Sequence, residues 1–167
     1  MLNLILALIS GVIGAVVVAF IPTEKHRLRN TAMFAALASA LIFSWRTAIL
    51  VFAGADLELA CELGGLSWRL RPDPLGAMFA LIASTLWFFA ALYSAGYMAG
   101  KKNLKTYYSF FLLANSVTLG VACAGNLVAL YLFYELLTLA TYPLVIHERS
   151  PEAVKAGSKS RPRPKSC

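Results

Sequence analysis

Long apolar runs separated by short polar segments dominate the pattern of this chain. About 20 consecutive apolar residues are enough to cross a bilayer as a helix. Five runs approach or exceed that length, with approximate limits 2–22, 31–53, 74–99, 106–124 and 127–146. Lipid offers no partners to backbone groups, and none of the runs alternates apolar and polar residues as a barrel strand would. The pattern therefore predicts an all-α polytopic membrane protein with about five transmembrane helices.

Charged residues lie almost entirely between the apolar runs, and their sign differs from one connection to another. Lysine and arginine dominate residues 23–30, residues 100–105 and the tail after residue 146, whereas residues 54–73 hold four acidic residues. Membrane proteins keep their basic loops in the cytoplasm. We therefore expect the N-terminus outside, the C-terminus in the cytoplasm, and a multi-pass location in the lipid bilayer of the cell's inner (plasma) membrane.

The remaining composition excludes several function classes. The net charge of +7 follows from the basic loops and tail, so it is not a nucleic-acid signal and we expect no nucleic-acid partner. The three cysteines, Cys61, Cys123 and Cys167, are far apart and show no CxxC or other metal-ligand spacing. The sequence contains no nucleotide-binding loop and no pair of haem ligands. We expect no cofactor, no metal site and no redox chemistry in this chain.

Residues 1–146 are expected to form one five-helix transmembrane domain, and residues 147–167 a cytoplasmic basic tail. The ending "SKSRPRPKSC" is polar and contains proline, so it cannot bury an apolar face and is expected to be disordered. In a genuine short protein this basic tail would lie on anionic lipid.

One acidic residue, Glu135, interrupts the fifth run, "LYLFYELLTLATYPL" (residues 130–144). It lies eight residues after the run begins, about 12 Å along a helix and near the middle of a ~30 Å hydrocarbon layer. A charged group there costs at least about 2.5 kcal/mol. The sequence therefore makes Glu135 a candidate relay that takes up and releases a proton. The alternative is a carboxyl that stays protonated and hydrogen-bonds between helices.

Three polar residues share a helix face with Glu135, namely Tyr131, Thr138 and Tyr142, because the spacings are four, three and four. The rest of this run is mostly apolar. We predict a polar stripe turned toward the interior of the bundle, as in a helix that lines a hydrated path. Pro143 cannot donate a backbone hydrogen bond and leaves one carbonyl free to hold a water, or it simply kinks the helix.

Three further polar residues are candidates for the same path. Asn115 in the fourth run would extend the polar interior, or it would hydrogen-bond between helices. Arg46 in the second run would snorkel to the outer surface, or it would form an ion pair with Glu135. His147, about 18 Å from Glu135 along the helix, would take up protons from the cytoplasm, or it would be an ordinary interfacial residue.

The stretch "GNLVALYLFYELLTLATYPLV", followed by "SPEAVKAG", resembles the fifth helix of the antiporter-like membrane subunits. That family includes the chain L, M and N type subunits of proton-pumping NADH:quinone oxidoreductase, the large D-type subunits of multi-subunit sodium/proton antiporters, and the large membrane subunits of hydrogenases. The stretch "LRPDPLGAMFALIASTLWFFAALYSAGYM" is similar to the family's third helix, with Asp73 and Leu75 at its start and Tyr97 and Met98 at its end. The resemblance covers roughly residues 1–157.

This resemblance implies an ion-translocating role. By position, Glu135 matches the family's key ion-translocation glutamate, which is thought to work with a lysine on the seventh helix. The resemblance also implies transport of protons, with or without Na⁺, together with other membrane subunits of a multi-subunit complex that carry any redox chemistry. Family members have considerably more helices, so this chain matches an N-terminal five-helix fragment without that lysine. The ending after residue 157 resembles nothing in the family, which implies a frameshift or premature stop, with a genuine short protein as the alternative. The alternatives are a structural or assembly subunit, or a nonfunctional remnant.

Overall fold

The computed structural model describes residues 2–22, 25–63, 66–97 and 104–147. Within these ranges the chain forms five helices and one two-stranded hairpin. In chain order they are α1 (Leu2–Phe20), α2 (His26–Phe52), β1 (Leu59–Leu63), β2 (Leu66–Leu70), α3 (Pro74–Tyr97), α4 (Leu104–Ala122) and α5 (Leu127–His147). Each apolar run overlaps one helix. The tail after His147 lies outside the described residues, so its disorder stays a prediction.

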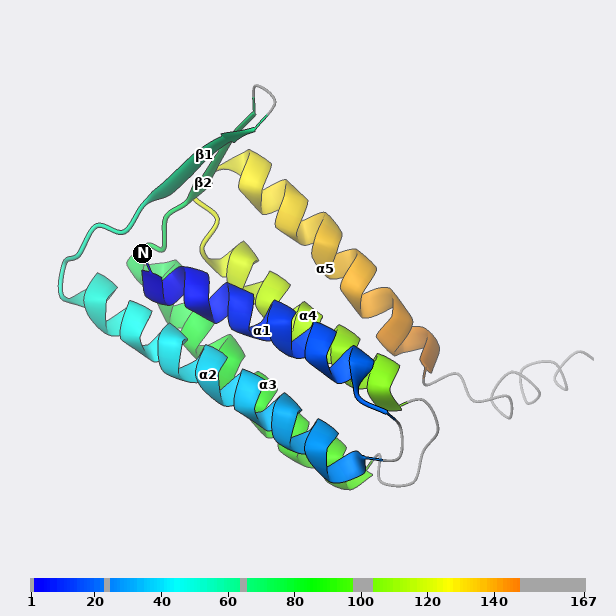
Figure 1. Ribbon diagram of the computed structural model, residues 1–167. Coiled ribbons are helices and arrows are strands. Elements are labelled where there is room, and N and C mark those ends of the chain that lie inside the picture. The colour runs from blue at the N-terminus through cyan, green and yellow to red at the C-terminus, as the bar shows by residue number, and fades with distance from the viewer. Residues whose placement is uncertain (1, 23–24, 64–65, 98–103, 148–167) are drawn as a thin grey trace, which may run out of the picture.

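Helix α4 lies at the centre of the bundle. Helices α1, α3 and α5 pack against it, and α2 packs against α1 and α3 (Figure 1). The side chain of Ser109 in α4 donates a hydrogen bond to the carbonyl of Ala15 in α1 (2.8 Å). The indole nitrogen of Trp87 in α3 donates to the carbonyl of Phe111 in α4 (3.1 Å). More than half of the α4 residues are buried, so this helix organises the packing of the others.

Four helices, α1, α2, α3 and α5, are long and apolar enough to cross a membrane. Helix α4 is not among them because it carries Lys105 and a series of polar residues that includes Asn115. Its 19 residues still give a length of about 28 Å, and it lies alongside α1 (Figure 1). The predicted all-α polytopic membrane fold is confirmed. Which end faces the cytoplasm stays a prediction.

Small residues bring the helices of this bundle into close contact. Gly14 of α1 faces Ala36 of α2, and a Cβ atom added at Gly14 would overlap the Ala36 side chain. Gly11 faces Ser116 of α4 in the same way. Lipid tails compete for apolar contacts, so helix association in a membrane depends on such close approach. The positions of these small residues therefore determine which faces of α1 meet α2 and α4.

The two-stranded hairpin is an element that was not predicted from the sequence. Strands β1 and β2 pair antiparallel, with Cys61 opposite Trp68 and Glu62 opposite Ser67. The backbone of β2 continues into contacts with the turn between α4 and α5, because the N–H of Gly125 donates to the carbonyl of Arg69 (2.7 Å). The glycine pair between two short strand-like runs was the available signal.

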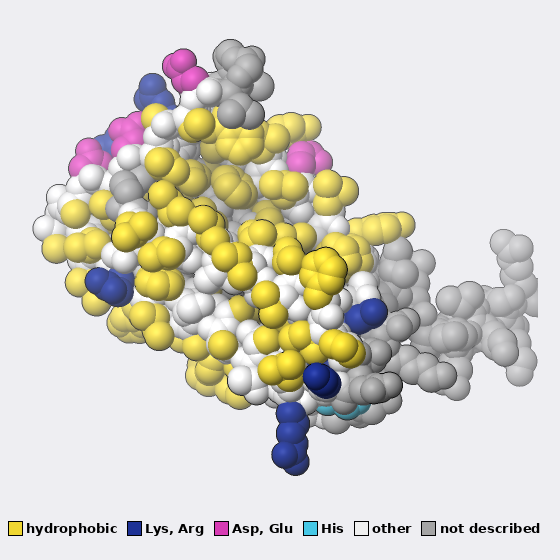
Figure 2. All heavy atoms as spheres, in the orientation of Figure 1, with side chains coloured by type: hydrophobic (Ala, Val, Ile, Leu, Met, Phe, Trp, Pro, Cys, Tyr) yellow, Lys and Arg dark blue, Asp and Glu magenta, His cyan; other side chains and the backbone are white. Residues whose placement is uncertain are grey.

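Charge is separated between the two ends of the bundle. Four of the five described acidic residues lie between Asp56 and Asp73, in and around the hairpin. At the opposite end, Lys25 and Arg27 are exposed at the start of α2, and Lys105 is exposed at the start of α4. Figure 2 shows acidic side chains gathered near the hairpin and several Lys and Arg side chains at the other end, beside a histidine. The fifth acidic residue is Glu135.

Candidate functional site

Helix α5 presents two different faces. One face packs against α4 through the buried residues Ala129 and Ala140 and through Phe133, whose ring lies against Gly120. The predicted polar stripe begins two positions after Ala129, which is about 200° around the helix. All four residues of that stripe are exposed: Tyr131, Glu135, Thr138 and Tyr142. The stripe therefore shares one face, as predicted, but this face points away from α4.

The prediction that the stripe turns into the interior is wrong for the described part of the bundle. The physical reason lies in the packing of α5. Lipid tails are as apolar as the interior of the bundle, so burying apolar side chains does not stabilise one helix orientation over another. The face that allows the closest approach therefore becomes the contact face. In α5 that face carries Ala129 and Ala140, whereas the stripe carries the bulky Tyr131 and Tyr142.

Glu135 is a free carboxyl group in the middle of α5. Within the described residues its side chain forms no hydrogen bond and no ion pair. The two ion pairs among the described residues both lie at the hairpin end. One joins Arg69 and Glu58 (3.9 Å), and the other joins Arg71 and Asp56 (3.1 Å). Glu135 is thus an isolated acid on a helix whose length and hydropathy fit a membrane span.

The hydroxyl groups near Glu135 are already bonded within the helix. Thr138 and Thr141 each donate to the carbonyl one turn earlier, at 3.1 and 2.9 Å. Pro143 lies inside α5 and supplies no backbone donor to the carbonyl of Leu139. The stripe therefore combines one titratable carboxyl, two phenol groups and a backbone carbonyl that lacks its regular helical donor.

The structure does not bring the other predicted residues to this stripe. Asn115 is 1% exposed inside α4, where its Oδ1 has no hydrogen-bond partner among the described residues. It belongs to the bundle core and not to the polar face around Glu135. Arg46 is exposed on α2, and the alternative of an ion pair with Glu135 is not formed among the described residues, because α5 packs mainly against α4. The side chain of His147 lies outside the described atoms, so its role in proton uptake stays a prediction.

An apolar groove of about 390 Å³ runs between α1 and α5, with α4 as its floor. Leu8 and Val12 form one wall, and Phe133 and Leu136 form the other. Ser116 lies on the floor, where its buried hydroxyl has no hydrogen-bond partner in the described part of the chain. A groove of this composition suits a hydrocarbon chain or apolar side chains, and it offers an ion no ligands beyond one hydroxyl.

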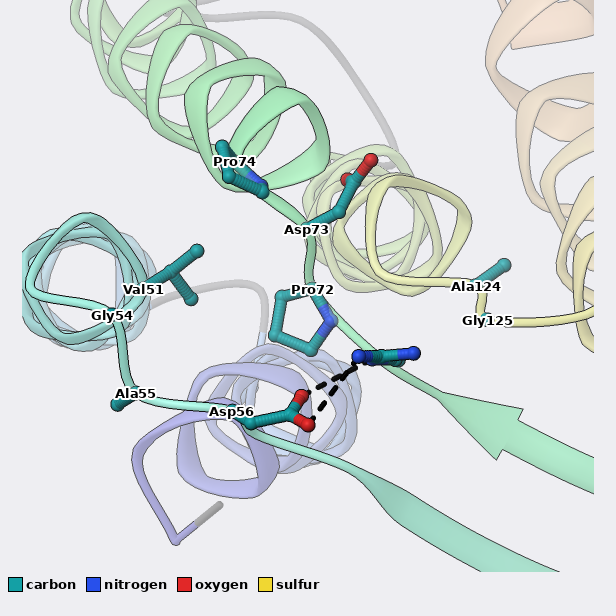
Figure 3. Close-up of a pocket in the computed structure, with 10 residues that line it drawn as sticks. Val51, Gly54, Ala55, Asp56, Pro72, Asp73, Pro74, Ala124 and Gly125 are labelled. Atoms are coloured by element: carbon teal, nitrogen blue, oxygen red, sulfur yellow. Dashed lines mark hydrogen bonds and ion pairs between the residues drawn. The ribbon is translucent and has the colours of Figure 1, made fainter.

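A second cavity of about 440 Å³ lies at the hairpin end, beside the start of α3 (Figure 3). The Arg71 side chain bridges both carboxylate oxygens of Asp56, at 3.1 and 3.3 Å. Asp73 points away from this pair and caps α3 by accepting a hydrogen bond from the N–H of Gly76 (2.7 Å). Both carboxylates therefore have structural partners, and the cavity carries no further titratable group.

One buried charge is not apparent from the sequence. Arg29 belongs to the basic residues of 23–30, but it lies in the first turn of α2 and is 1% exposed. Its position just before a long apolar run gives no signal of burial, because the helix and its packing partners are not visible in the local sequence.

Asn126 holds the start of α5 and links it to the hairpin. Its Oδ1 accepts a hydrogen bond from the N–H of Ala129 (2.9 Å), and its Nδ2 donates to the carbonyl of Ser67 (2.5 Å). Replacing Asn126 by alanine should lower the free energy of unfolding by about 2 kcal/mol, because one helix cap and one further hydrogen bond are lost. Unfolding of the purified protein by denaturing detergent measures this loss.

The matched control is Asn126→Ser. Serine keeps a side-chain oxygen that can cap α5 and loses the donor to Ser67, so it should cost about half as much. Equal stability of the alanine variant and the unsubstituted protein would show that the cap contributes nothing.

Comparisons with known proteins agree with this architecture. Residues 62–111 match the family described as NADH-ubiquinone oxidoreductase (complex I), chain 5 N-terminus. The chain is 33% identical over 95 residues, 57% of its length, to a Na⁺/H⁺ antiporter subunit A1 of Staphylococcus aureus strain JH9, and equally to that of strain Newman. The fold is similar to a chain of the membrane-bound sulfane sulfur reductase, an archaeal respiratory membrane complex, with a TM-score of 0.76 and 23% identity over 90% of this chain.

The chain spans 12% of the length of the antiporter subunits and 24% of the solved chain. The matched family region runs from β1 into α4 and ends before α5, so it includes the third-helix stretch but not Glu135. The resemblance seen in the sequence is confirmed, because part of the chain matches the N-terminal family of chain 5 of complex I and the chain is similar to subunit A1 of Na⁺/H⁺ antiporters.

Proposed function

We propose that this chain is the N-terminal part of an ion-translocating, antiporter-like subunit, and that Glu135 is its intramembrane proton relay. One observation carries the proposal. Glu135 is an acid without a partner among the described residues, near the middle of a helix with the composition of a membrane span. Such an acid is costly in lipid and is found in membranes mainly where it serves transport.

The chemistry of the relay follows from the neighbours of Glu135. The carboxyl is neutral when protonated and tolerates an apolar surrounding, whereas the carboxylate needs a cation or a hydrated path. Tyr131 and Tyr142 flank it along the stripe and offer phenol groups as hydrogen-bond donors and acceptors. His147, at the end of α5, is the proposed point of proton uptake from the cytoplasm. The transported ion is H⁺, alone or exchanged for Na⁺.

The exposed stripe also requires partners. Only 11% of the α5 span is buried, and a carboxylate facing lipid is unfavourable. We infer that further membrane helices, from the remainder of a longer subunit or from other subunits of a complex, cover this face in the plasma membrane. The similar proteins support this inference, because they are subunits or chains of larger membrane assemblies.

A hydrophobic carbodiimide tests the relay directly. Dicyclohexylcarbodiimide adds to protonated carboxyl groups in apolar surroundings, so membranes that carry the protein should form an adduct at Glu135. Mass spectrometry should locate the adduct, and proton uptake by inverted vesicles should decline with the same time course. Glu62 in the exposed hairpin should stay unmodified. No adduct at Glu135, or an adduct without loss of uptake, would contradict the proposal.

The alternative is a structural or assembly subunit, and the largely uncovered surface of α5 favours it. In that case the open face of α5 would serve only to bind neighbouring helices. The carbodiimide adduct would then disturb assembly of the complex and leave proton uptake by the intact complex unchanged. Native gel electrophoresis of the treated membranes separates these two results.

A further inference from the structure

Arg29 is a buried cation whose charge nothing in the described chain balances. It is 1% exposed and lies in the first turn of α2. Its Nη2 donates to Nδ1 of His26 (3.1 Å), but its Nε and Nη1 are buried and have no hydrogen-bond partner in the described residues. Arginine does not lose its proton in proteins, so burial does not remove this charge.

An aromatic ring holds the guanidinium of Arg29 in place. The guanidinium lies over the ring of Tyr108 in α4, with Cζ 5.6 Å from the ring centre. The hydroxyl of Tyr108 donates to the carbonyl of Ser94 in α3 (3.5 Å), and the buried hydroxyl of Ser94 itself has no partner among the described atoms. Tyr108 and His26 therefore hold the guanidinium, whose Nε and Nη1 are left as buried donors without an acceptor among the described residues.

The position of Arg29 in α2 points the same way. The N-terminus of a helix carries a partial positive charge, so a cation in the first turn is disfavoured unless an anion joins it. The exposed residues Lys25, Arg27 and Lys105 lie at the same end of the bundle and add to the positive potential there. An uncompensated buried charge is strongly destabilising. An anionic ligand would therefore stabilise both the guanidinium and the N-terminal end of α2.

We propose that Arg29, stacked on Tyr108, binds a phosphate group at this end of the bundle. Phosphate accepts several charge-assisted hydrogen bonds and matches the planar guanidinium better than it matches a lysine ammonium. The phosphate belongs either to the headgroup of an anionic phospholipid or to free phosphate in solution. This site is separate from Glu135, and it stands whether or not Glu135 carries protons.

Thermal unfolding of the full-length protein in mild detergent tests the site. Phosphatidylglycerol should raise the unfolding temperature of the unsubstituted protein, and diacylglycerol, a lipid with the same acyl chains but no phosphate, should not. Arg29→Gln should weaken the apparent affinity for phosphatidylglycerol by about tenfold or more, the effect of one strong charge-assisted contact. Arg27→Gln removes an exposed charge two positions away and should change this affinity only slightly.

Titration with inorganic phosphate identifies the source of the group. A response to phosphatidylglycerol that phosphate does not reproduce assigns the site to lipid, and an equal response to phosphate assigns it to the free ion. Equal responses to both lipids with none to phosphate would overturn the proposal, as would equal losses in the Arg29 and Arg27 variants. Arg29→Lys, which keeps the charge but not the planar donors, gives the same comparison if Arg29→Gln does not fold.

Discussion

Replacing Glu135 by glutamine should reduce proton uptake by inverted membrane vesicles by about two orders of magnitude or more, because the variant keeps the shape of the side chain but cannot exchange a proton. The free carboxyl on the exposed stripe of α5 is the only described acid outside the hairpin region. No other described group can therefore replace it within the span. Quenching of an acridine dye in vesicles from cells that carry the variant gene measures the loss.

Two controls make this result specific. Glu135→Asp keeps a titratable carboxyl and should retain part of the activity, although the shorter side chain shifts the oxygens by about one bond. Glu62→Gln removes the same charge from the exposed hairpin and should leave uptake unchanged. The variants must be present in equal amounts in the membrane. Normal uptake in the glutamine variant would exclude Glu135 as the relay and favour a structural role for this chain.

Replacing Gly120 by valine should separate α5 from α4 and destabilise the protein. A Cβ atom at Gly120 would overlap the ring of Phe133, an aromatic side chain that joins the two helices. Overpacking of this kind costs about 1–3 kcal/mol, and α4 is the only described helix with which α5 packs extensively. Unfolding in denaturing detergent should therefore occur at a lower detergent concentration, and less of the protein should accumulate in the membrane.

Gly96 supplies the matched control. It also lies in a membrane helix, but a Cβ atom added there meets none of the described residues within 4 Å, so Gly96→Val should have little effect. Adding Phe133→Ala to Gly120→Val should restore part of the stability, because the overlap then disappears. A Gly120 variant as stable as the Gly96 variant would show that the α4–α5 contact is not as tight as described.

The sequence was sufficient for the helices but not for their orientation. Apolar runs fix where helices form, because lipid leaves the backbone no other choice. Spacing also placed Tyr131, Glu135, Thr138 and Tyr142 on one face of α5. Spacing cannot say where that face points, because in a membrane both the interior and the lipid accept apolar side chains. The orientation depends on small residues such as Ala129, whose effect appears only when the neighbouring helix is known.

Arg29 shows the same limit for a single residue. Its neighbours in sequence are polar and basic, and they predict an exposed loop. Arg29 is buried where Tyr108 of α4, a helix far away in the chain, packs against its guanidinium. The hairpin itself could have been predicted from its glycine pair. Its contacts with the turn before α5 could not, because they join residues that are far apart in the chain, such as Asn126 and Ser67.

The central position of α4 has a consequence for how the protein enters the membrane. The helix that contacts most of the others is also the one whose hydropathy does not suffice for a span. A segment of this kind partitions poorly into lipid by itself, and its polar side chains are kept from lipid by the neighbouring helices. Only a short turn separates α4 from α5, which is apolar enough to insert. We therefore expect α4 to enter the membrane late, together with α5, and to pack against helices that are already inserted. The outer helices of the bundle would then be inserted before its central helix.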